Sequence, residues 1–183
     1  PAGAITEVPR RVGERAMGAV NGLLYAEGRL DVGEVATTAV IDAVKSAAPA
    51  RDLTILDAPP GTTCPVVDTI RDCDYLLLVT EPTPFGLWDL RLAVRMAAAL
   101  GLPHGVVINR AGIGDDRVEA WCGRRGVQVV GSIPDSRQLA RLYAKGNLAA
   151  RADVGFARLF EGLLGDVLVA AGEQPRRGKG RWS

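Results

Sequence analysis

The sequence has few of the residues that build metal sites and redox centres. It contains three cysteines, Cys64, Cys73 and Cys122, which are widely separated and include no Cys-x-x-Cys pair. Its one histidine, His104, is followed by an expected strand, a position that favours a surface loop over catalysis. A zinc or iron–sulfur site built by this chain alone is therefore excluded. Reduced thiols of this kind favour a cytoplasmic protein.

Long apolar runs and glycine-rich phosphate loops are also missing. No stretch reaches the roughly 18 apolar residues that a membrane helix needs, so we expect no membrane span. No Gly-x-Gly-x-x-Gly follows an expected strand, which disfavours a dinucleotide-dependent oxidoreductase. No Gly-Lys-Ser/Thr sequence occurs, and only Lys45 and Lys145 precede the last eleven residues. A phosphate-binding P-loop is therefore absent from this chain.

Positive charge is scarce outside the C-terminal segment. The net charge is +1 over 183 residues, and four basic residues lie among the last nine, which contain no acid. Removing these four charges leaves −3 for the remaining chain, so a nucleic-acid partner is not expected. We expect residues 173–183 to form a basic, disordered tail.

Strands alternate with helices along most of the chain. Asn21-Gly22 suits a two-residue turn, which predicts a hairpin over residues 15–26. Apolar runs predict strands at 53–56, 75–80, 105–108 and 127–130, and helical periodicity predicts helices over 33–48, 86–100, 115–125, 136–145 and 156–167. The expected fold class is α/β: a mostly parallel sheet with helices on both faces, plus an N-terminal β-hairpin.

The stretch from Leu53 to Pro65 concentrates the candidate chemistry. A short apolar run ends on Asp57, Pro59-Pro60-Gly61 forces a turn, and a helix is expected to begin near Thr62. A carboxylate beside a helix start suits Mg²⁺ and a terminal phosphate. The residues alone leave other interpretations open. Asp57 can be a turn former, and Gly61 can serve only the bend.

Three motifs together resemble a known family. They are Asp-Ala-Pro-Pro-Gly-Thr-Thr-Cys-Pro at 57–65, Val-Thr-Glu-Pro-Thr-Pro-Phe-Gly at 79–86 with Asp89-Leu90, and the pair Asn109-Arg110 with Ile133-Pro134-Asp135. They are similar to the MinD/Mrp/ParA group of P-loop ATPases, most of all to MinD-superfamily ATPases with an inserted ferredoxin domain. The opening residues 1–7 resemble the segment that follows the last cluster cysteine of a ferredoxin module.

The resemblance implies a role for each matching residue. Asp57 resembles the acid that holds Mg²⁺, usually through a water, and Gly61 the glycine whose N–H meets the γ-phosphate. Asn109 resembles the side chain that recognises adenine, although a cap for the turn after its strand is an alternative. Two further sets complete the expected cofactor-binding residues: Arg110 beside Asn109, and Pro134 with Asp135 in the loop that flanks the base.

The resemblance also implies a domain organisation and partners. Residues 1–30 would be a hairpin remnant after a ferredoxin-like insert, and residues 31–172 the carboxyl-terminal part of a P-loop ATPase domain. The implied cofactors are ATP and Mg²⁺, with 4Fe–4S clusters only in a missing N-terminal portion. The implied partners are a second copy when the protein is intact and an iron–sulfur protein.

The function implied is an ATP-binding, ATP-hydrolysing switch associated with iron–sulfur clusters. Without the phosphate-binding loop, this chain is not expected to be catalytic alone. The alternative is a non-catalytic, partner-binding half of a split or degenerate ATPase.

Overall fold

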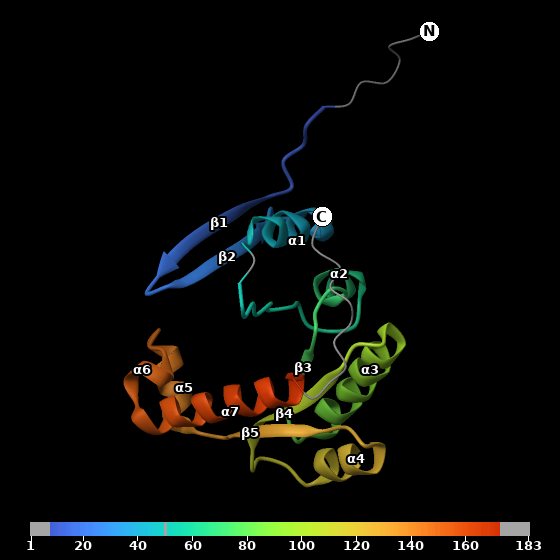
Figure 1. Ribbon diagram of the computed structural model, residues 1–183, viewed down its shortest axis with the longest axis vertical. Coiled ribbons are helices and arrows are strands. Elements are labelled where there is room, and N and C mark those ends of the chain that lie inside the picture. Colours follow the sequence, from blue (N-terminus) through green and yellow to red (C-terminus); the bar gives the residue numbers. More distant parts are fainter. Residues whose placement is uncertain (1–7, 50, 173–183) are drawn as a thin grey trace. The chain divides into compact units, whose positions relative to one another are not determined.

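The computed structural model describes residues 8–49 and 51–172, which form two compact units. One unit runs to Ile70 and the other begins at Arg71 (Figure 1). The predicted tail at 173–183 and the ferredoxin-like segment at 1–7 lie outside the described residues.

The first unit begins with the predicted hairpin, which is longer than expected. Strands β1 (Gly13–Val20) and β2 (Leu23–Leu30) pair antiparallel. Asn21 and Gly22 have φ values of 51° and 82°, the positive values that a two-residue hairpin turn requires. Helix α1 (Thr37–Ala47) packs on the hairpin so closely that a Cβ at Gly28 would lie 2.5 Å from the Val40 side chain.

The predicted strand at 53–56 does not form. These residues are irregular, and Leu53 and Ile55 are 49% and 78% exposed. A strand is stabilised by hydrogen bonds to its neighbours, and this apolar run pairs with none of the described strands. Helix α2 (Cys64–Ile70) follows, close to where a helix was expected, and buries Val66 and Ile70.

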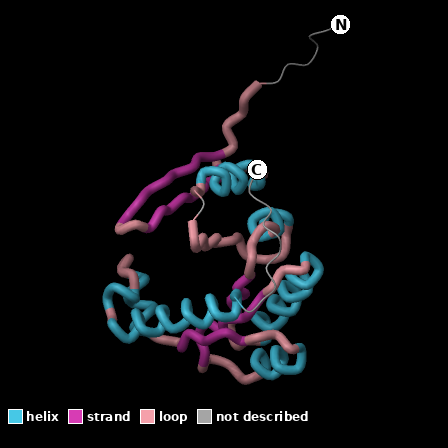
Figure 2. The backbone as a smooth tube through the Cα atoms, in the orientation of Figure 1, coloured by secondary structure: helices cyan, strands magenta, loops and turns pink. Residues whose placement is uncertain are grey.

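The second unit is built on a three-stranded parallel sheet in the order β3-β4-β5 (Figure 2). The strands are β3 (Leu76–Thr80), β4 (His104–Ala111) and β5 (Val129–Pro134). Both β4 and β5 run further than the apolar runs predicted, because β4 includes Asn109-Arg110 and β5 ends on Pro134. The α/β class with helices flanking a parallel sheet and an N-terminal hairpin is confirmed.

Local signals explain where the helices of this unit begin and end. They are α3 (Pro84–Leu100), α4 (Arg117–Arg125), α5 (Arg137–Ala144), α6 (Ala149–Ala152) and α7 (Val154–Gly172). Thr83 and Ser136 cap α3 and α5 with their hydroxyl oxygens, and Gly101 ends α3 at a φ of 60°. Among the helices of residues 8–49 and 51–172, none is long and apolar enough to cross a membrane.

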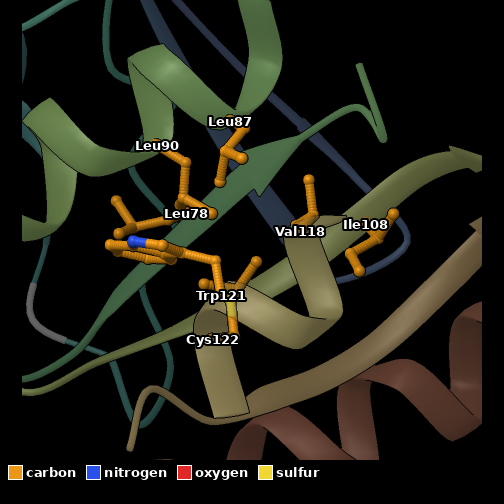
Figure 3. Packing of buried hydrophobic residues seen from close by; sticks show 8 residues of the cluster. Leu78, Leu87, Leu90, Ile108, Val118, Trp121 and Cys122 are labelled. Atoms are coloured by element: carbon orange, nitrogen blue, oxygen red, sulfur yellow. The ribbon is translucent and has the colours of Figure 1, made fainter. Parts of the chain in front are cut away.

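The core lies on both faces of the sheet, because successive strand residues point to opposite sides. On one face, Leu78, Val106 and Ile108 pack against α3 and α4, which contribute Leu87, Leu90, Val118, Trp121 and Cys122 (Figure 3). On the other face, Val107 and Val130 pack against Ala170 of α7. Helix α7 covers β4 and β5 but not β3, where Leu77 and Val79 remain 36% and 62% exposed.

Candidate functional site

Three loops at the carboxyl ends of the parallel strands meet through one side chain. Arg110, at the end of the central strand β4, lies with its Nε atom 3.0 Å from Asp135 Oδ1 after β5. Its Nη1 atom lies 3.5 Å from Glu81 Oε1 after β3. The structure therefore brings Arg110, Pro134 and Asp135 to one edge of the sheet, and their role in binding a base stays a prediction. No chemistry was expected of Glu81, although an acid that directly follows an expected strand is a signal for the ligand-binding edge of an α/β sheet.

The backbone of Arg110 is held in an unusual conformation. Its φ is 55°, and Asn21 in the hairpin turn is the other described non-glycine residue with a positive φ. The register of β4 against β5 shifts between Ile108 and Ala111, so Asn109 and Arg110 form an irregularity in the strand. A left-handed residue of this kind costs about 1–3 kcal/mol. Solvent-exposed ion pairs contribute little to stability, so the arrangement is not a net source of stability.

The charges of the cluster are half-exposed and sum to a negative value. The side chains of Arg110, Asp135 and Glu81 are 51%, 42% and 41% exposed. The pKa of the Arg110 guanidinium is raised above its usual value, first by the hydrogen bond to Asp135 and then by the charge of Glu81. One cation between two carboxylates leaves a local excess of negative charge. Such a corner suits neutral polar groups and hydrogen-bond donors better than phosphate oxygens.

The side chain of Asn109 is oriented by the backbone of its neighbour. Its Oδ1 accepts a hydrogen bond from the Arg110 backbone N–H at 3.0 Å. This is the turn-capping role that the sequence left open as an alternative. One lone pair of Asn109 Oδ1 and its two amide N–H donors remain available for other hydrogen bonds. An adenine contact therefore stays compatible with the capping role and stays a prediction.

Tight backbone packing holds the same three loops together. The Asp135 N–H donates to the Ala111 carbonyl at 3.0 Å, which joins the loops after β4 and β5. A Cβ at Gly114 would lie 1.5 Å from the Pro82 carbonyl oxygen, so the loop after β4 also touches the loop after β3. Only glycine permits that approach. Residues 81–83, 109–114 and 134–135 thus form one continuous surface, which we call the strand-tip wall.

Asp57 and Gly61 lie in the other compact unit. Asp57 is exposed at the end of the irregular segment, which leaves its carboxylate accessible. Gly61 is also exposed, has a φ of 95°, and a Cβ added there would meet no atom within 4 Å. The backbone conformation therefore demands glycine at this position, whereas packing within the protein does not.

The residues present fit Mg²⁺ only as a companion of bound phosphates. No group of three or more His, Cys, Asp or Glu side chains able to hold a metal occurs within the described ranges. Mg²⁺ in phosphate sites commonly takes one or two protein carboxylates together with phosphate oxygens and waters, and Asp57 can supply one. The chain does not fit a 4Fe–4S cluster, which requires four cysteine ligands where the chain has three cysteines.

Comparisons of the sequence with known proteins find two relatives that match part of the chain. No known family profile matches the chain. The chain is 31% identical over 128 residues to uncharacterized protein MJ0579 of Methanocaldococcus jannaschii, and the aligned region makes up 69% of this chain and 44% of that protein. It is 31% identical over 88 residues to uncharacterized protein MJ0578 of the same organism, which covers 47% and 32%. The chain thus spans less than half the length of either relative.

Solved structures extend the comparison to the fold. The MinD cell division protein of Aquifex aeolicus superposes with a TM-score of 0.57 at 17% identity, over 81% of this chain and 64% of that one. The fold of this chain is therefore similar to that of the MinD cell division protein. A putative plasmid partition protein of Borrelia burgdorferi B31 bound to AMPPNP gives a TM-score of 0.45 at 18% identity, over 57% and 45%. That likeness is too low to support an argument.

Proposed function

We propose that this chain supplies the base-binding wall of an ATP-dependent switch of the MinD type. The observation that carries the proposal is the wall of strand-tip loops joined by Arg110, at the carboxyl edge of a parallel sheet. Open α/β sheets bind their ligands at that edge. In this proposal Asn109, Pro134 and Asp135 contact adenine.

The charge of the wall supports the base rather than the phosphates as its ligand. The carboxylates of Glu81 and Asp135 carry two negative charges against the one positive charge of Arg110, so phosphate oxygens would be repelled there. Adenine is neutral and offers both donors and acceptors. The exocyclic amino group of adenine would find carboxylate and carbonyl acceptors nearby, and Asn109 could donate to a ring nitrogen.

The phosphate-binding wall is proposed to come from polypeptide outside residues 1–183. No Gly-Lys-Ser/Thr loop occurs in the sequence. Among the described strands, β3 pairs only with β4, and its Leu77 and Val79 are exposed although strands of parallel sheets are usually covered. The relatives continue well beyond the part that this chain matches. An additional strand carrying the phosphate loop would cover β3 and complete the site.

The chain's own residues would then act in three ways. Asp57 would hold Mg²⁺ through a water, Gly61 would offer its N–H to the terminal phosphate, and the loops around Arg110 would orient the base. Bound Mg²⁺ neutralises phosphate charge and so assists hydrolysis. Without the phosphate loop we expect no hydrolysis by this chain alone.

The domain organisation, the cellular location and the partners are proposed from the same family resemblance. Residues 1–30 would follow a ferredoxin-like insert, with 4Fe–4S clusters in polypeptide outside this chain. Residues 31–172 would complete the ATPase domain. The intact protein would act in the cytoplasm as a homodimer, coupled to an iron–sulfur protein.

Calorimetry with Mg-ATP tests the proposal. We expect this chain to bind no better than about millimolar, because most phosphate contacts are missing. Asn109→Ala should weaken that binding further, whereas Asn147→Ala, an exposed asparagine outside the strand tips, should not. Micromolar binding by the chain alone would contradict the proposal, and so would equal affinities for wild type and Asn109→Ala.

A second candidate function is a partner-binding module without catalysis. The N-terminal turn of α3 exposes Phe85 and Trp88, at 85% and 60%, and large aromatic residues are enriched at protein interfaces. If partner binding is the whole function, the double variant Phe85→Ala, Trp88→Ala will not form the complex. The wild-type chain will then bind no nucleotide. Measurable Mg-ATP binding at the strand tips would favour the first candidate.

A further inference from the structure

Arg110 lies at a position from which its side chain reaches both neighbouring loops. The strand order β3-β4-β5 places β4 in the middle, and Arg110 lies near its carboxyl end. A planar guanidinium presents several donors in fixed directions, so it can contact Asp135 and Glu81 at once. Lysine would carry a single point charge and could not reproduce both contacts.

The backbone of the same residue controls Asn109. The left-handed conformation at Arg110, with a φ of 55°, accompanies the hydrogen bond from its N–H to Asn109 Oδ1. Both features belong to the irregularity at Asn109-Arg110, so relaxation of this segment to a regular strand would move the peptide plane between the two residues and release the Asn109 side chain. The ion pairs to Asp135 and Glu81 restrain the side chain and so oppose that relaxation.

We infer that Arg110 is a positioning residue that preforms the base-binding wall. Its side chain joins the three strand-tip loops, and its backbone fixes the side chain of Asn109. The inference rests on the proposed function, because the preformed wall is assigned to the base of a nucleotide. Arg110 itself acts through Asn109 and the Asp135 loop and need not touch the base.

The first test measures hydrogen exchange in the strand-tip loops in the absence of any ligand. In NMR spectra of the full chain, the Arg110 Nε–H should exchange slowly with water, and Asp135→Asn should speed that exchange. Arg110→Ala should accelerate backbone amide exchange at Asp135, which bonds to the β4 loop, by about tenfold. Arg117→Ala is the matched control, because Arg117 pairs locally with Asp115 in a nearby loop. Unchanged exchange at Asp135 in Arg110→Ala would overturn the inference.

The second test measures base selectivity with AMP and GMP as probes, since a single phosphate depends little on a phosphate loop. We expect Arg110→Ala to weaken AMP binding about tenfold and to remove the preference over GMP, with an unchanged melting temperature. Arg110→Lys should resemble Arg110→Ala, and Arg117→Ala should stay within about twofold of wild type. Full AMP affinity and preference in Arg110→Ala would overturn the inference.

The two tests separate failure of this inference from failure of the proposed function. If wild type binds neither AMP nor GMP at millimolar concentrations, the assignment of the wall to a base is wrong. The positioning role is then decided by amide exchange alone. Faster exchange in Arg110→Ala supports it, and unchanged exchange refutes it.

Discussion

Gly114 lies directly against Pro82, so that a Cβ on Gly114 would be 1.5 Å from the Pro82 carbonyl oxygen. This contact joins the loop after β4 to the loop after β3 at the edge where the candidate site lies. Backbone oxygen cannot move aside as a flexible side chain can, so the two loops must separate if Gly114 gains a side chain. The strand-tip wall therefore depends on a glycine outside the recognised motifs.

Gly114→Ala should destabilise the chain by about 1–3 kcal/mol, the usual range for overpacking. Urea unfolding monitored by circular dichroism measures the change. Gly123→Ala is the matched control, because a Cβ there meets nothing within 4 Å in the interior of α4. That substitution should stabilise by about 0.5–1 kcal/mol through helix propensity. Equal effects of the two substitutions would refute the contact with Pro82.

Arg110→Gly should leave the free energy of unfolding within about 1 kcal/mol of wild type. Glycine removes the cost of the positive φ, and the lost ion pairs are solvent-exposed and contribute little. Chemical denaturation at low and high salt measures both contributions. A loss above about 3 kcal/mol would show that the exposed ion pairs of Arg110 make a large contribution to stability.

Trp121→Ala should destabilise by about 3–5 kcal/mol, because the ring is buried among Leu78, Leu90 and Val118 and leaves a cavity when removed. Trp88→Ala should change stability by no more than about 0.5 kcal/mol, since Trp88 is 60% exposed. Denaturation followed by circular dichroism compares the two. A large loss in Trp88→Ala would mean that this ring is packed in solution.

The free energy of unfolding should fall as the pH rises above about 9. Burial, and then the charge of Glu119, raises the pKa of the Cys122 thiol above its usual value of 9.0. The unfolded chain therefore releases this proton first, and the stability contribution present below pH 9 is lost as the pH rises through the folded pKa. Burial likewise raises the pKa of Tyr75.

Denaturation curves at pH 7, 9 and 10.5 measure this dependence. Cys122→Ala will be less stable at every pH because it leaves a cavity, but its stability should fall less steeply between pH 9 and 10.5. Tyr75→Phe should reduce the remaining slope. A wild-type stability that is flat over this range would contradict the burial of both groups.

Short-range signals made much of the fold predictable. Asn21-Gly22 indicated the hairpin because its turn needs two positive φ values, and those values are found. Gly101 after Leu100 marked the end of α3, whereas the helix begins at Pro84, two residues before the expected Gly86, because the Thr83 hydroxyl caps it there. Apolar runs indicated β3 and the beginning of β4; β4 buries residues on both of its faces, whereas β3 buries Leu78 and Thr80 on one face.

Features that depend on distant partners were not predictable. Residues 53–56 have the composition of a buried strand, but a strand needs paired neighbours, and these residues remain irregular. The link from Arg110 to Glu81 joins positions 29 residues apart, which only the strand order brings together. The short helix α6 has too few residues for a periodic pattern. The roles of Asp57, Gly61 and Asn109 stay predictions.

The central claim is that one wall of a nucleotide site lies at the carboxyl edge of the β3-β4-β5 sheet. NMR titration of the isotope-labelled chain with Mg-ATP tests it most directly, residue by residue. The account predicts shifts concentrated at Asn109, Arg110 and Asp135, saturating in the millimolar range. Shifts confined to other surfaces, or none at 10 mM, about ten times the expected dissociation constant, would contradict it.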